Sequence, residues 1–487
     1  MAAATNVIGA NIKGNDVQLT PPPPPAGLKA LIDMLQIVYP DQPNPLQVTT
    51  LLKYWLGGQD PLDYISMYNN QGDAAKGILP HWHYVSFGLS DLHGDGRVHA
   101  LENDKLELNK RSGMGFELTF RLQKTEEELR EESLGKKIRP PTWPANLLQS
   151  IARYCFQTGN NLCFGDNIPW RKSLDGKNNS RLQNILIAQD AQLEILETPF
   201  GMVEFCQIVG VTDEELEQAS RWNGRGVLNY LRQDIQTGGE WLVTNMERNL
   251  SVFELFPERL VSLQDDLEKQ GSDLAGVNSE FTFREVSRPK MASQEEIKQE
   301  IDFQTLNSQC MVDEYNRNIQ QQDIQQIKRE EASTAFPASM SMSSSSLHKS
   351  CPLDYQPQAP ESISLDGIEI TLAPYAAKYL MLAIKDRIRH GRHFTFKAQH
   401  LALTLVAESV TGASVTKTSP YGIIGYWIQV LIPDDLVTRM MADFQSAKLD
   451  GRSEVQQRIE FEWPDKHLKL IIDQPSAHMV PPTPMNM

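Results

Sequence analysis

The chain of 487 residues has no apolar run long enough to cross a membrane, which takes about 18 residues, so we expect no membrane span. Its first 18 residues lack the charged stretch and apolar core of a secretory signal. Cysteines are few, odd in number and without a Cys-x-x-Cys spacing: Cys155, Cys163, Cys206, Cys310 and Cys351. These absences argue against a disulfide framework or a zinc ribbon. They favour a reducing compartment, cytoplasmic or nucleocytoplasmic.

The sequence also lacks the short motifs of common enzymes. It contains no GxSxG elbow, no P-loop and no GxGxxG that follows a strand pattern. Carboxylates abound, since there are 62 Asp and Glu residues, and pairs of them therefore arise by chance. No constellation argues for a catalytic site, so we expect a protein that is not an enzyme and needs no cofactor.

Positive charge is scarce relative to negative charge. The 46 Lys and Arg residues leave a net charge of -16. An overall field of this sign repels a phosphate backbone, so direct binding to DNA is not expected. The acidity suits a partner of basic character, or it serves solubility alone. The sequence leaves both interpretations open.

A long polar stretch divides the chain. Residues 287–361 carry few large apolar side chains and many Gln, Glu, Ser, Lys and Asn, so we predict a disordered regulatory insert. The predicted organisation is a Pro-rich leader at 1–25, an N-terminal domain at 26–286, this insert, a C-terminal domain at 362–475 and a disordered tail at 476–487. Both domains mix helix and strand patterns without a βαβ rhythm, which predicts an α+β fold of two mixed domains.

Apolar periodicity predicts the individual elements. Strand patterns occur at 64–68, 84–89, 116–122, 203–209, 241–244, 252–256, 368–372, 394–397, 401–405, 427–431 and 468–472. Helical spacing occurs at 27–39, 45–57, 147–155, 375–389 and 436–444. Thr212 and Glu215 form a capping-box pattern, which predicts a further helix that begins there.

A histidine cluster is the one candidate for a metal site. His81 and His83 flank one residue on a strand pattern, which places both imidazoles on the same face. Asp91 and His93 follow in a glycine-rich turn, so a metal-dependent enzyme that uses these four residues is one alternative. The other alternative is that these histidines merely occupy a strand end and a loop.

A basic and aromatic segment stands out in the acidic chain. It runs from His390 to Phe394 and adjoins Lys385, Arg387 and Arg389. It could bind an acidic segment of a partner or of the chain's own insert. Alternatively, its arginines complement the dipole at a helix C-terminus.

The predicted insert carries candidate modification sites. Lys298 and Lys328 each lie in an apolar-Lys-x-Glu pattern, which is typical of SUMO attachment. Ser343 and Ser344 lie in a serine-rich run that offers hydroxyls to kinases. A second alternative function is therefore a general scaffold that recruits partners through the insert.

Several long strings resemble one protein family. They include KYWLGGQDPLDYISMY at 53–68, SGMGFELTFRL at 112–122, PPTWP at 140–144 and HGRHFT at 390–395. These strings, spread over both predicted domains, resemble Suppressor of fused in a form close to the insect members. The resemblance implies a cytoplasmic and nuclear negative regulator of Hedgehog signalling. Such a protein binds and sequesters Gli/Cubitus interruptus transcription factors, and it is not an enzyme.

The resemblance also implies a binding mode. A Ser-Tyr-Gly-His segment of the partner is held as a β-strand between the two domains, which is β-augmentation. Further implied partners are the Fused kinase and a kinesin-like scaffold of the same pathway. The residues that match the family's contacts are Tyr154, Leu162, Asp166, Val277, Ser279, Arg387, His390 and Arg392. Asp166 is the aspartate that would receive the partner's histidine, and Tyr375 stands where vertebrate members have a contact glutamate.

Overall fold

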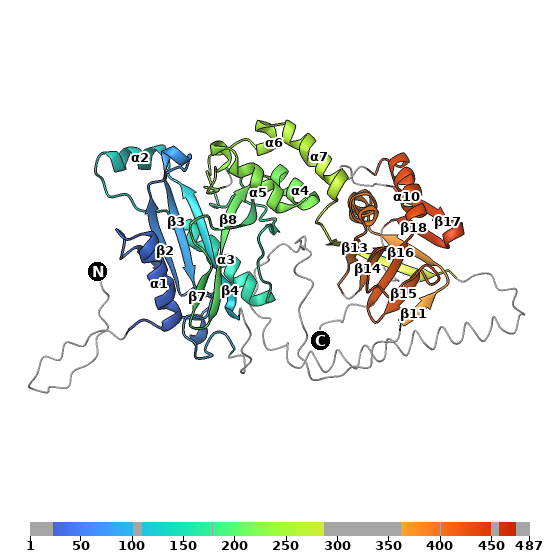
Figure 1. Cartoon of the computed structure of the whole chain (residues 1–487), viewed down its shortest axis with the longest axis horizontal. Coiled ribbons are helices and arrows are strands. Elements are labelled where there is room, and N and C mark those ends of the chain that lie inside the picture. The colour runs from blue at the N-terminus through green and yellow to red at the C-terminus, as the bar shows by residue number, and fades with distance from the viewer. Residues whose placement is uncertain are drawn as a thin grey trace, which may run out of the picture.

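The computed structural model describes residues 23–100, 110–177, 179–286, 362–399, 401–449 and 457–473. The predicted insert at 287–361 lies outside these residues, and so do the tail, most of the leader and four candidate modification sites, Lys298, Lys328, Ser343 and Ser344. Helices and strands are mixed in both described halves, which confirms the α+β prediction (Figure 1). None of the described helices has the length and apolarity that a membrane span requires.

The first half is built on an eight-stranded sheet, in the order β1-β2-β3-β4-β8-β6-β5, with β7 paired to β8. All neighbours are antiparallel except β4 and β8, which are parallel. The strands are β1 (Leu46–Thr49), β2 (Tyr64–Asn70), β3 (His81–Phe87), β4 (Arg111–Gln123), β5 (Asn167–Ile168), β6 (Asn184–Gln189), β7 (Leu196–Thr198) and β8 (Gly201–Val211). The short strand β5 therefore ends the sheet on one side, and β1 ends it on the other.

Helices cover both faces of this sheet. Because side chains alternate along a strand, Trp82 and Tyr84 of β3 pack with α3, whereas Val85 and Phe87 pack with α1 on the other face. The helices are α1 (Ala26–Val38), α2 (Glu126–Ser133), α3 (Trp143–Thr158), α4 (Asp213–Arg221), α5 (Gly224–Arg232), α6 (Val252–Leu255) and α7 (Glu258–Gln270). The predicted capping box at Thr212 and Glu215 is confirmed at the start of α4.

Three local predictions in this half are wrong. The helix predicted at 45–57 is strand β1 followed by a 3-10 turn at Tyr54–Leu56. The β-branched Val48, Thr49 and Thr50 favour an extended chain, and Leu51 is fully exposed rather than part of an apolar helix face. The predicted strand at 241–244 is a turn with one bridge to β4, and that at 252–256 is the helix α6.

The second half contains two sheets. One has four strands in the order β10-β12-β18-β17, and the other has six in the order β11-β15-β16-β14-β13-β9. The strands are β9 (Gly276–Asn278), β10 (Phe281–Glu285), β11 (Ser362–Leu365), β12 (Ile368–Leu372), β13 (His393–Lys397), β14 (Ala402–Ala407), β15 (Tyr421–Ile424), β16 (Trp427–Ile432), β17 (Ile459–Trp463) and β18 (Leu468–Ile472).

The pairing of β9 and β10 corrects the predicted domain boundary. We placed the segment up to residue 286 in the N-terminal domain. Instead, β9 pairs with β13 and β10 pairs with β12, so both complete the sheets of the second half. The chain therefore crosses from the first half to the second in the segment 271–275, well before the predicted insert. Local sequence pattern could not reveal this, because strand partners are set by tertiary contacts.

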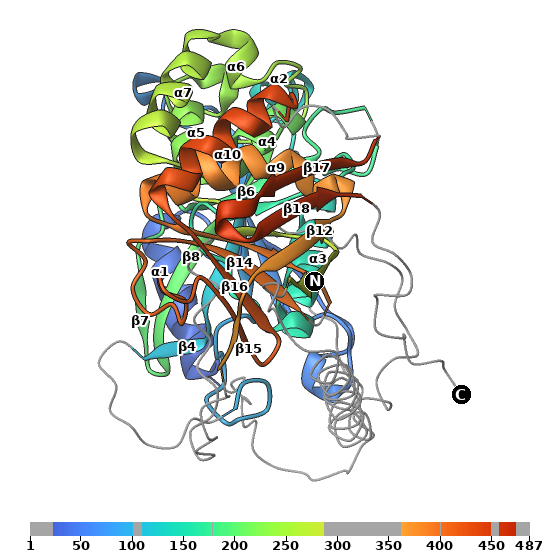
Figure 2. The same cartoon turned by 90° about the vertical axis from the view of Figure 1, so that its right-hand side faces the viewer.

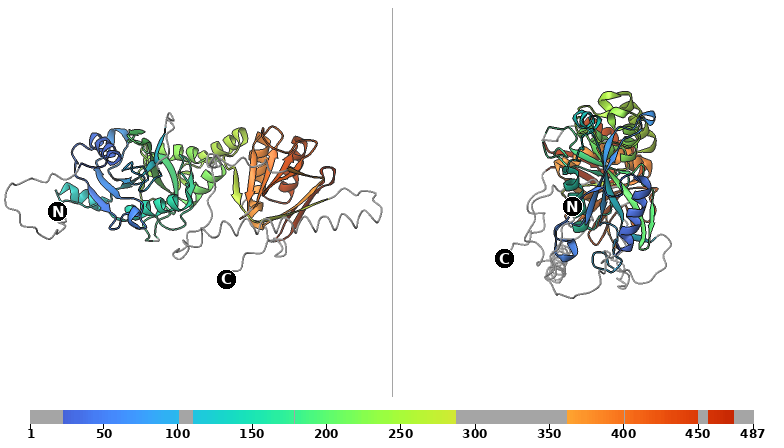
Figure 3. Two further views of the ribbon diagram at one scale, coloured as in Figure 1. Left: turned by 90° about the horizontal axis from the view of Figure 1, so that it is seen from below. Right: turned by 90° about the vertical axis from the view of Figure 1, so that its left-hand side faces the viewer.

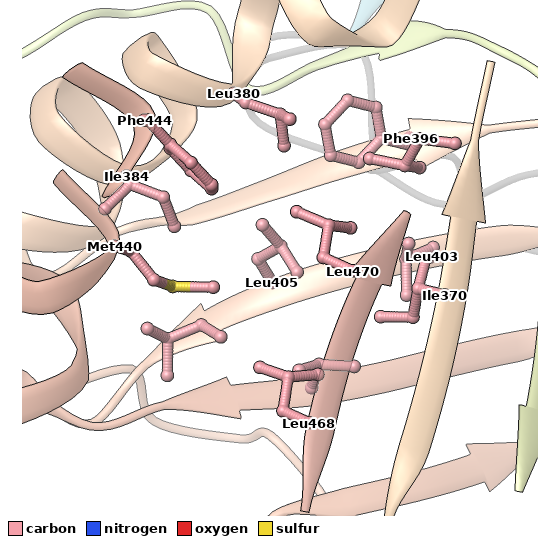
Figure 4. A pocket seen from close by; sticks show the side chains of 13 residues that line it. Ile370, Leu380, Ile384, Phe396, Leu403, Leu405, Met440, Phe444, Leu468 and Leu470 are labelled. Atoms are coloured by element: carbon pink, nitrogen blue, oxygen red, sulfur yellow. The ribbon is translucent and has the colours of Figure 1, made fainter. Parts of the chain in front are cut away.

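An apolar core joins the two sheets to the helices of the second half. Helix α9 (Ala377–Met381) continues through a π-helical turn (Leu382–Arg387) and a 3-10 turn (Ile388–His390), and it lies next to α10 (Asp434–Ser446) (Figure 2). Figure 4 shows Leu470 and Ile370 from one sheet, Leu403 and Leu405 from the other, and Met440 from α10 converging on one point. The cavity left between them is only about 10 Å³. Such close packing provides a rigid frame for the sheet edges.

Candidate functional site

The end of α3 and the loop after it form the first part of the candidate site. Three of the predicted contact residues lie here: Tyr154, Leu162 and Asp166. Leu162 is buried, and Tyr154 packs against the same apolar core while its ring remains partly exposed. The Asn160 side chain donates a hydrogen bond to the Tyr154 hydroxyl at 2.6 Å, which fixes the ring beside the loop.

Asp166 organises this loop and leads directly into the edge strand β5. Its carboxylate accepts a hydrogen bond from the Cys163 N–H at 2.8 Å, and its own N–H donates to the Cys163 carbonyl at 3.0 Å. Its carbonyl accepts from the Ile187 N–H of β6 at 2.9 Å. A partly exposed carboxylate is thus held in a defined position at the last strand of the first sheet.

Strand β9 is the corresponding edge of the second half. The Ala275 carbonyl accepts from the Thr395 N–H at 2.9 Å, and the Ser279 N–H donates to the Lys397 carbonyl at 3.0 Å. Main-chain groups alternate in direction along a strand, so those of Gly276 and Asn278 point away from β13, toward the edge of the sheet. Figure 3 (left) shows β9, in yellow-green, on the side of the second half that faces the first half.

The two predicted contact residues on or beside β9 do not present exposed side chains. Val277 is buried in the apolar core of the second half, and Ser279 is 9% exposed. Their side chains therefore support the strand. The groups of β9 that a partner can bind are main-chain N–H and C=O groups. Hydrogen bonds to them require an extended partner segment but do not depend on its side chains.

The basic segment of the second half binds the chain itself. Arg387 and Arg392 both donate hydrogen bonds to the Ser272 carbonyl, at 2.8 and 2.7 Å. Lys385 and Arg389 form ion pairs with Glu268, at the end of α7. These contacts lie before the insert, at the end of α7 and just after it, and the sequence interpretations did not include them. Contacts to the insert lie outside the described residues.

Burial shifts the titration of groups at this junction. Burial, together with the neighbouring positive charge of Arg392, lowers the pKa of Arg387 to about 10. Burial also raises the pKa of Asp386 to about 6 and lowers the pKa of His390, whose ring lies against Gly271. His390 therefore packs in the junction between the halves.

The histidine pair lies in a fully buried polar network. His81 and His83 share one face of β3, as predicted, and both are 0% exposed. His83 Nε2 lies 3.1 Å from an Asp190 carboxylate oxygen, and its Nδ1 lies 2.8 Å from the Tyr39 hydroxyl. Arg121 donates to His81 Nε2 at 2.8 Å and to Asp190 at 2.7 Å. Every ring nitrogen of the pair is thus engaged, since His81 Nδ1 also bonds the Leu79 carbonyl.

The structure does not bring the proposed metal ligands together. Asp91 caps its own turn by accepting from the N–H groups of His93 and Gly94, whereas His93 Nε2 lies 3.6 Å from an Asp63 carboxylate oxygen. Within the described ranges, no group of three or more potential ligands has a geometry that could hold a metal ion. The His81 and His83 rings are therefore components of the buried network.

Sequence reasoning missed the junction between the two halves. Gly271 has a φ of +74°, and a Cβ there would lie 2.4 Å from the Asp386 carbonyl oxygen. The Ser272 N–H donates to that same carbonyl at 2.8 Å, and the Asp273 N–H donates to the Trp222 carbonyl of the first half at 2.8 Å. The signal in the sequence is a Gly-Ser-Asp stretch directly after a helix pattern, which marks an abrupt chain turn.

Comparison with known proteins identifies the family of the chain. The family model described as Suppressor of fused protein matches residues 58–249, and the model described as Suppressor of Fused Gli/Ci N terminal binding domain matches residues 261–472. The curated Suppressor of fused homologs of Mus musculus and Homo sapiens are each 37% identical over 468 residues, covering 92% of this chain and 91% of theirs. The crystal structure of Drosophila Suppressor of Fused is 70% identical, with a TM-score of 0.79, and covers 93% of this chain and 98% of that chain.

The fold and the site define a two-part α+β protein with an open sheet edge on each part. The chain belongs to the Suppressor of fused family, whose members regulate Hedgehog signalling. Its higher identity to the Drosophila structure than to the mammalian homologs confirms that it is close to the insect form. The second family model begins at residue 261, which agrees with the assignment of β9 and β10 to the second half.

Proposed function

We propose that this chain binds and sequesters Gli/Cubitus interruptus transcription factors by adding a Ser-Tyr-Gly-His segment as a strand between its two halves. The observation that carries the proposal is the pair of sheet edges: β5 ends the sheet of the first half, and β9 ends the six-stranded sheet of the second. An edge strand offers its main chain as a template for an extended segment. The second family model is described as a Gli/Ci N terminal binding domain, which supports this proposal.

The two edges make different contributions in this proposal. The main-chain groups of Gly276 and Asn278 supply hydrogen bonds that do not depend on the partner's sequence. Selectivity comes from the first half, where Tyr154 offers a partly exposed ring and Asp166 a carboxylate. A carboxylate favours the protonated form of a histidine that faces it, so it raises the pKa of the partner's histidine in the complex.

The biological role follows from this binding. As a negative regulator of Hedgehog signalling, the chain would hold the transcription factor in the cytoplasm and act as a corepressor in the nucleus, without catalysis. The family name, Suppressor of fused, points to the Fused kinase as a further partner, and we propose a kinesin-like scaffold of the same pathway as another. Imaging of the tagged chain in cells would locate it in the two compartments.

Replacing the Asp166 carboxylate tests the proposal. Asp166→Asn keeps an oxygen that can accept from the Cys163 N–H, so the loop is preserved while the charge is removed. We expect the affinity for a fluorescent Ser-Tyr-Gly-His peptide, measured by anisotropy at pH 6, to fall about tenfold, since a hydrogen bond between charged groups is lost. The difference between the two proteins should shrink as pH rises past 7 and the peptide histidine loses its proton.

The matched control is Asp265→Asn, which removes the same charge from an exposed position on α7. It should leave the affinity unchanged. Failure of the unmodified chain to bind the peptide would contradict the proposed function as a whole. Equal binding by Asp166→Asn and the unmodified chain would contradict only the role of Asp166.

A further inference from the structure

The bridge segment, residues 271–275, connects the two halves and is held on both sides. The Ser272 N–H and carbonyl bind the second half, through the Asp386 carbonyl and through two arginines. The Asp273 N–H binds the Trp222 carbonyl of the first half. Next along the chain, the Ala275 carbonyl accepts the first bond of the β9–β13 pair. The bridge segment therefore determines where β9 begins.

Two positive charges converge on one carbonyl oxygen in this segment. Arg387 is 4% exposed and spans two main-chain carbonyls, donating to His393 through Nε at 3.0 Å and to Ser272 through Nη1. Arg392 adds a second bond to Ser272 and lies 3.4 Å from an Asp273 carboxylate oxygen. The electrostatic attraction holds the bridge segment against the turn that carries both arginines.

Strand β9 is too short to hold its own position. It pairs with β13 over only three residues, and such a short pairing contributes little stability without anchors at its ends. Its C-terminal end is anchored by the Ser279 bond to Lys397, and its N-terminal end by the bridge segment. Without the N-terminal anchor, the whole three-residue pairing, including the Ser279 bond, should open more often.

We propose that Arg387 and Arg392 are positioning residues for partner binding. By fixing the Ser272 carbonyl, they hold β9 in register with β13 and so present the main-chain edge at Gly276 and Asn278. This inference rests on the proposed function, because it assigns a role at the same site. In this arrangement the two arginines do not contact the partner directly, and they affect its binding only through the position of β9.

The test compares Arg392→Ala with Arg389→Ala in the full-length chain. Arg392 is the better target of the pair because its side chain is 37% exposed, so its loss leaves the buried core intact. Arg389 belongs to the same basic segment but pairs with Glu268 on α7 instead of the bridge segment. Peptide affinity is measured by anisotropy, and the protection of the Ser279 amide is measured by hydrogen exchange.

We expect Arg392→Ala to weaken peptide binding about tenfold, the effect of losing one charge-assisted hydrogen bond. Protection of the Ser279 amide should fall by a similar factor, whereas amides of the β14–β16 pair and the Tm should stay unchanged. Arg389→Ala should change neither quantity. Arg392→Lys should restore both, because a lysine can make the single bond to the Ser272 carbonyl.

Other results would overturn the inference. Weaker binding with unchanged Ser279 protection would mean that Arg392 contacts the partner directly. Unchanged binding by Arg392→Ala, in a preparation whose unmodified chain binds the peptide, would remove the positioning role and leave the proposed function standing. Gly271→Ala perturbs the same junction without altering an arginine, since its Cβ would press on the Asp386 carbonyl and the His390 ring. If it leaves both measurements unchanged, the inference is also wrong.

Discussion

The buried network around His83 shows how single residues set the stability of the first half. Burial, together with the positive charge of Arg121, lowers the pKa of His83 to about 4. Burial by itself would raise the pKa of Asp190, but Arg121 and His83 hold it well below its ordinary value. A neutral histidine, an ionised aspartate and a charged arginine thus form one unit that links α1, β3 and β4. Acid disrupts such a unit, because protons bind the unfolded chain more readily.

His83→Gln should make stability less dependent on pH. The folded pKa of His83 is depressed from about 6.5 to about 4, so its contribution is present above pH 6.5 and is lost as pH falls toward 4. The loss amounts to about 3 kcal/mol over this window. Urea unfolding at a series of pH values should therefore give a slope smaller by about one proton for the variant. Part of the slope remains, because the pKa of His81 is lowered too.

The control for this measurement is His467→Gln, an exposed histidine of the second half. It should leave the pH dependence as it is in the unmodified chain. An identical slope for His83→Gln and the unmodified chain would mean that His83 carries a proton in the folded protein, against the network described here.

At the scale of elements, the sequence was a good guide where pattern and packing agree. The strand at 116–122 and the helix at 147–155 were both predicted from their apolar spacing. In the strand, however, the polar Glu117, Thr119 and Arg121 are buried as well, so both faces of β4 are covered. Short elements failed, because a few apolar residues fit a strand and a helix equally well. In the candidate site, the structure places Tyr154 at the end of α3 and Asp166 directly before the edge strand β5, and their contact with a partner stays a prediction. The partners of the basic segment were not predicted, because Ser272 is far away in sequence and contributes only a carbonyl.

Helix α6 illustrates a signal that was present and overlooked. Ser251 and Glu254 form a capping box, with the Glu254 N–H donating to the Ser251 hydroxyl at 3.0 Å and the Ser251 N–H donating to the Glu254 carboxylate at 2.6 Å. Ser251 is completely buried, so no water can replace these bonds. Ser251→Ala should lower the free energy of unfolding by about 1–2 kcal/mol, measured by urea denaturation.

The comparison variant for α6 is Ser262→Ala, in which an exposed hydroxyl on α7 is lost. It should change stability by less than about 0.5 kcal/mol. If both serine variants lose the same stability, the capping box does not hold α6. Peptide affinity should be unaffected in either variant, since neither serine touches β5, β9 or the bridge segment.

At the scale of the whole molecule, the two edges matter because they lie on different halves. A partner strand that pairs with both must hold the halves at one separation, so binding and domain spacing are coupled in the proposed function. The bridge segment is the structural link between them, and it precedes the predicted insert. The predicted insert instead follows β10 of the four-stranded sheet and precedes β11 of the six-stranded sheet, so both of its flanks belong to the second half. This placement separates the role of the insert from that of the edges.

The ends of the insert are held close together, so it can be replaced by a short linker. The Val286 N–H donates to the Gly367 carbonyl at 3.0 Å, and residue 362 is only five residues from Gly367, at most about 18 Å of chain. A Gly/Ser linker of about 12 residues in place of 288–360 therefore spans the gap. We expect this variant to keep the Tm and the peptide affinity of the unmodified chain within about twofold, by calorimetry and anisotropy, because both edges and the bridge segment are intact. A loss of affinity at unchanged Tm would instead assign binding to the insert, as the scaffold alternative requires, and phosphomimetic changes at Ser343 and Ser344 would then be the next variants to measure.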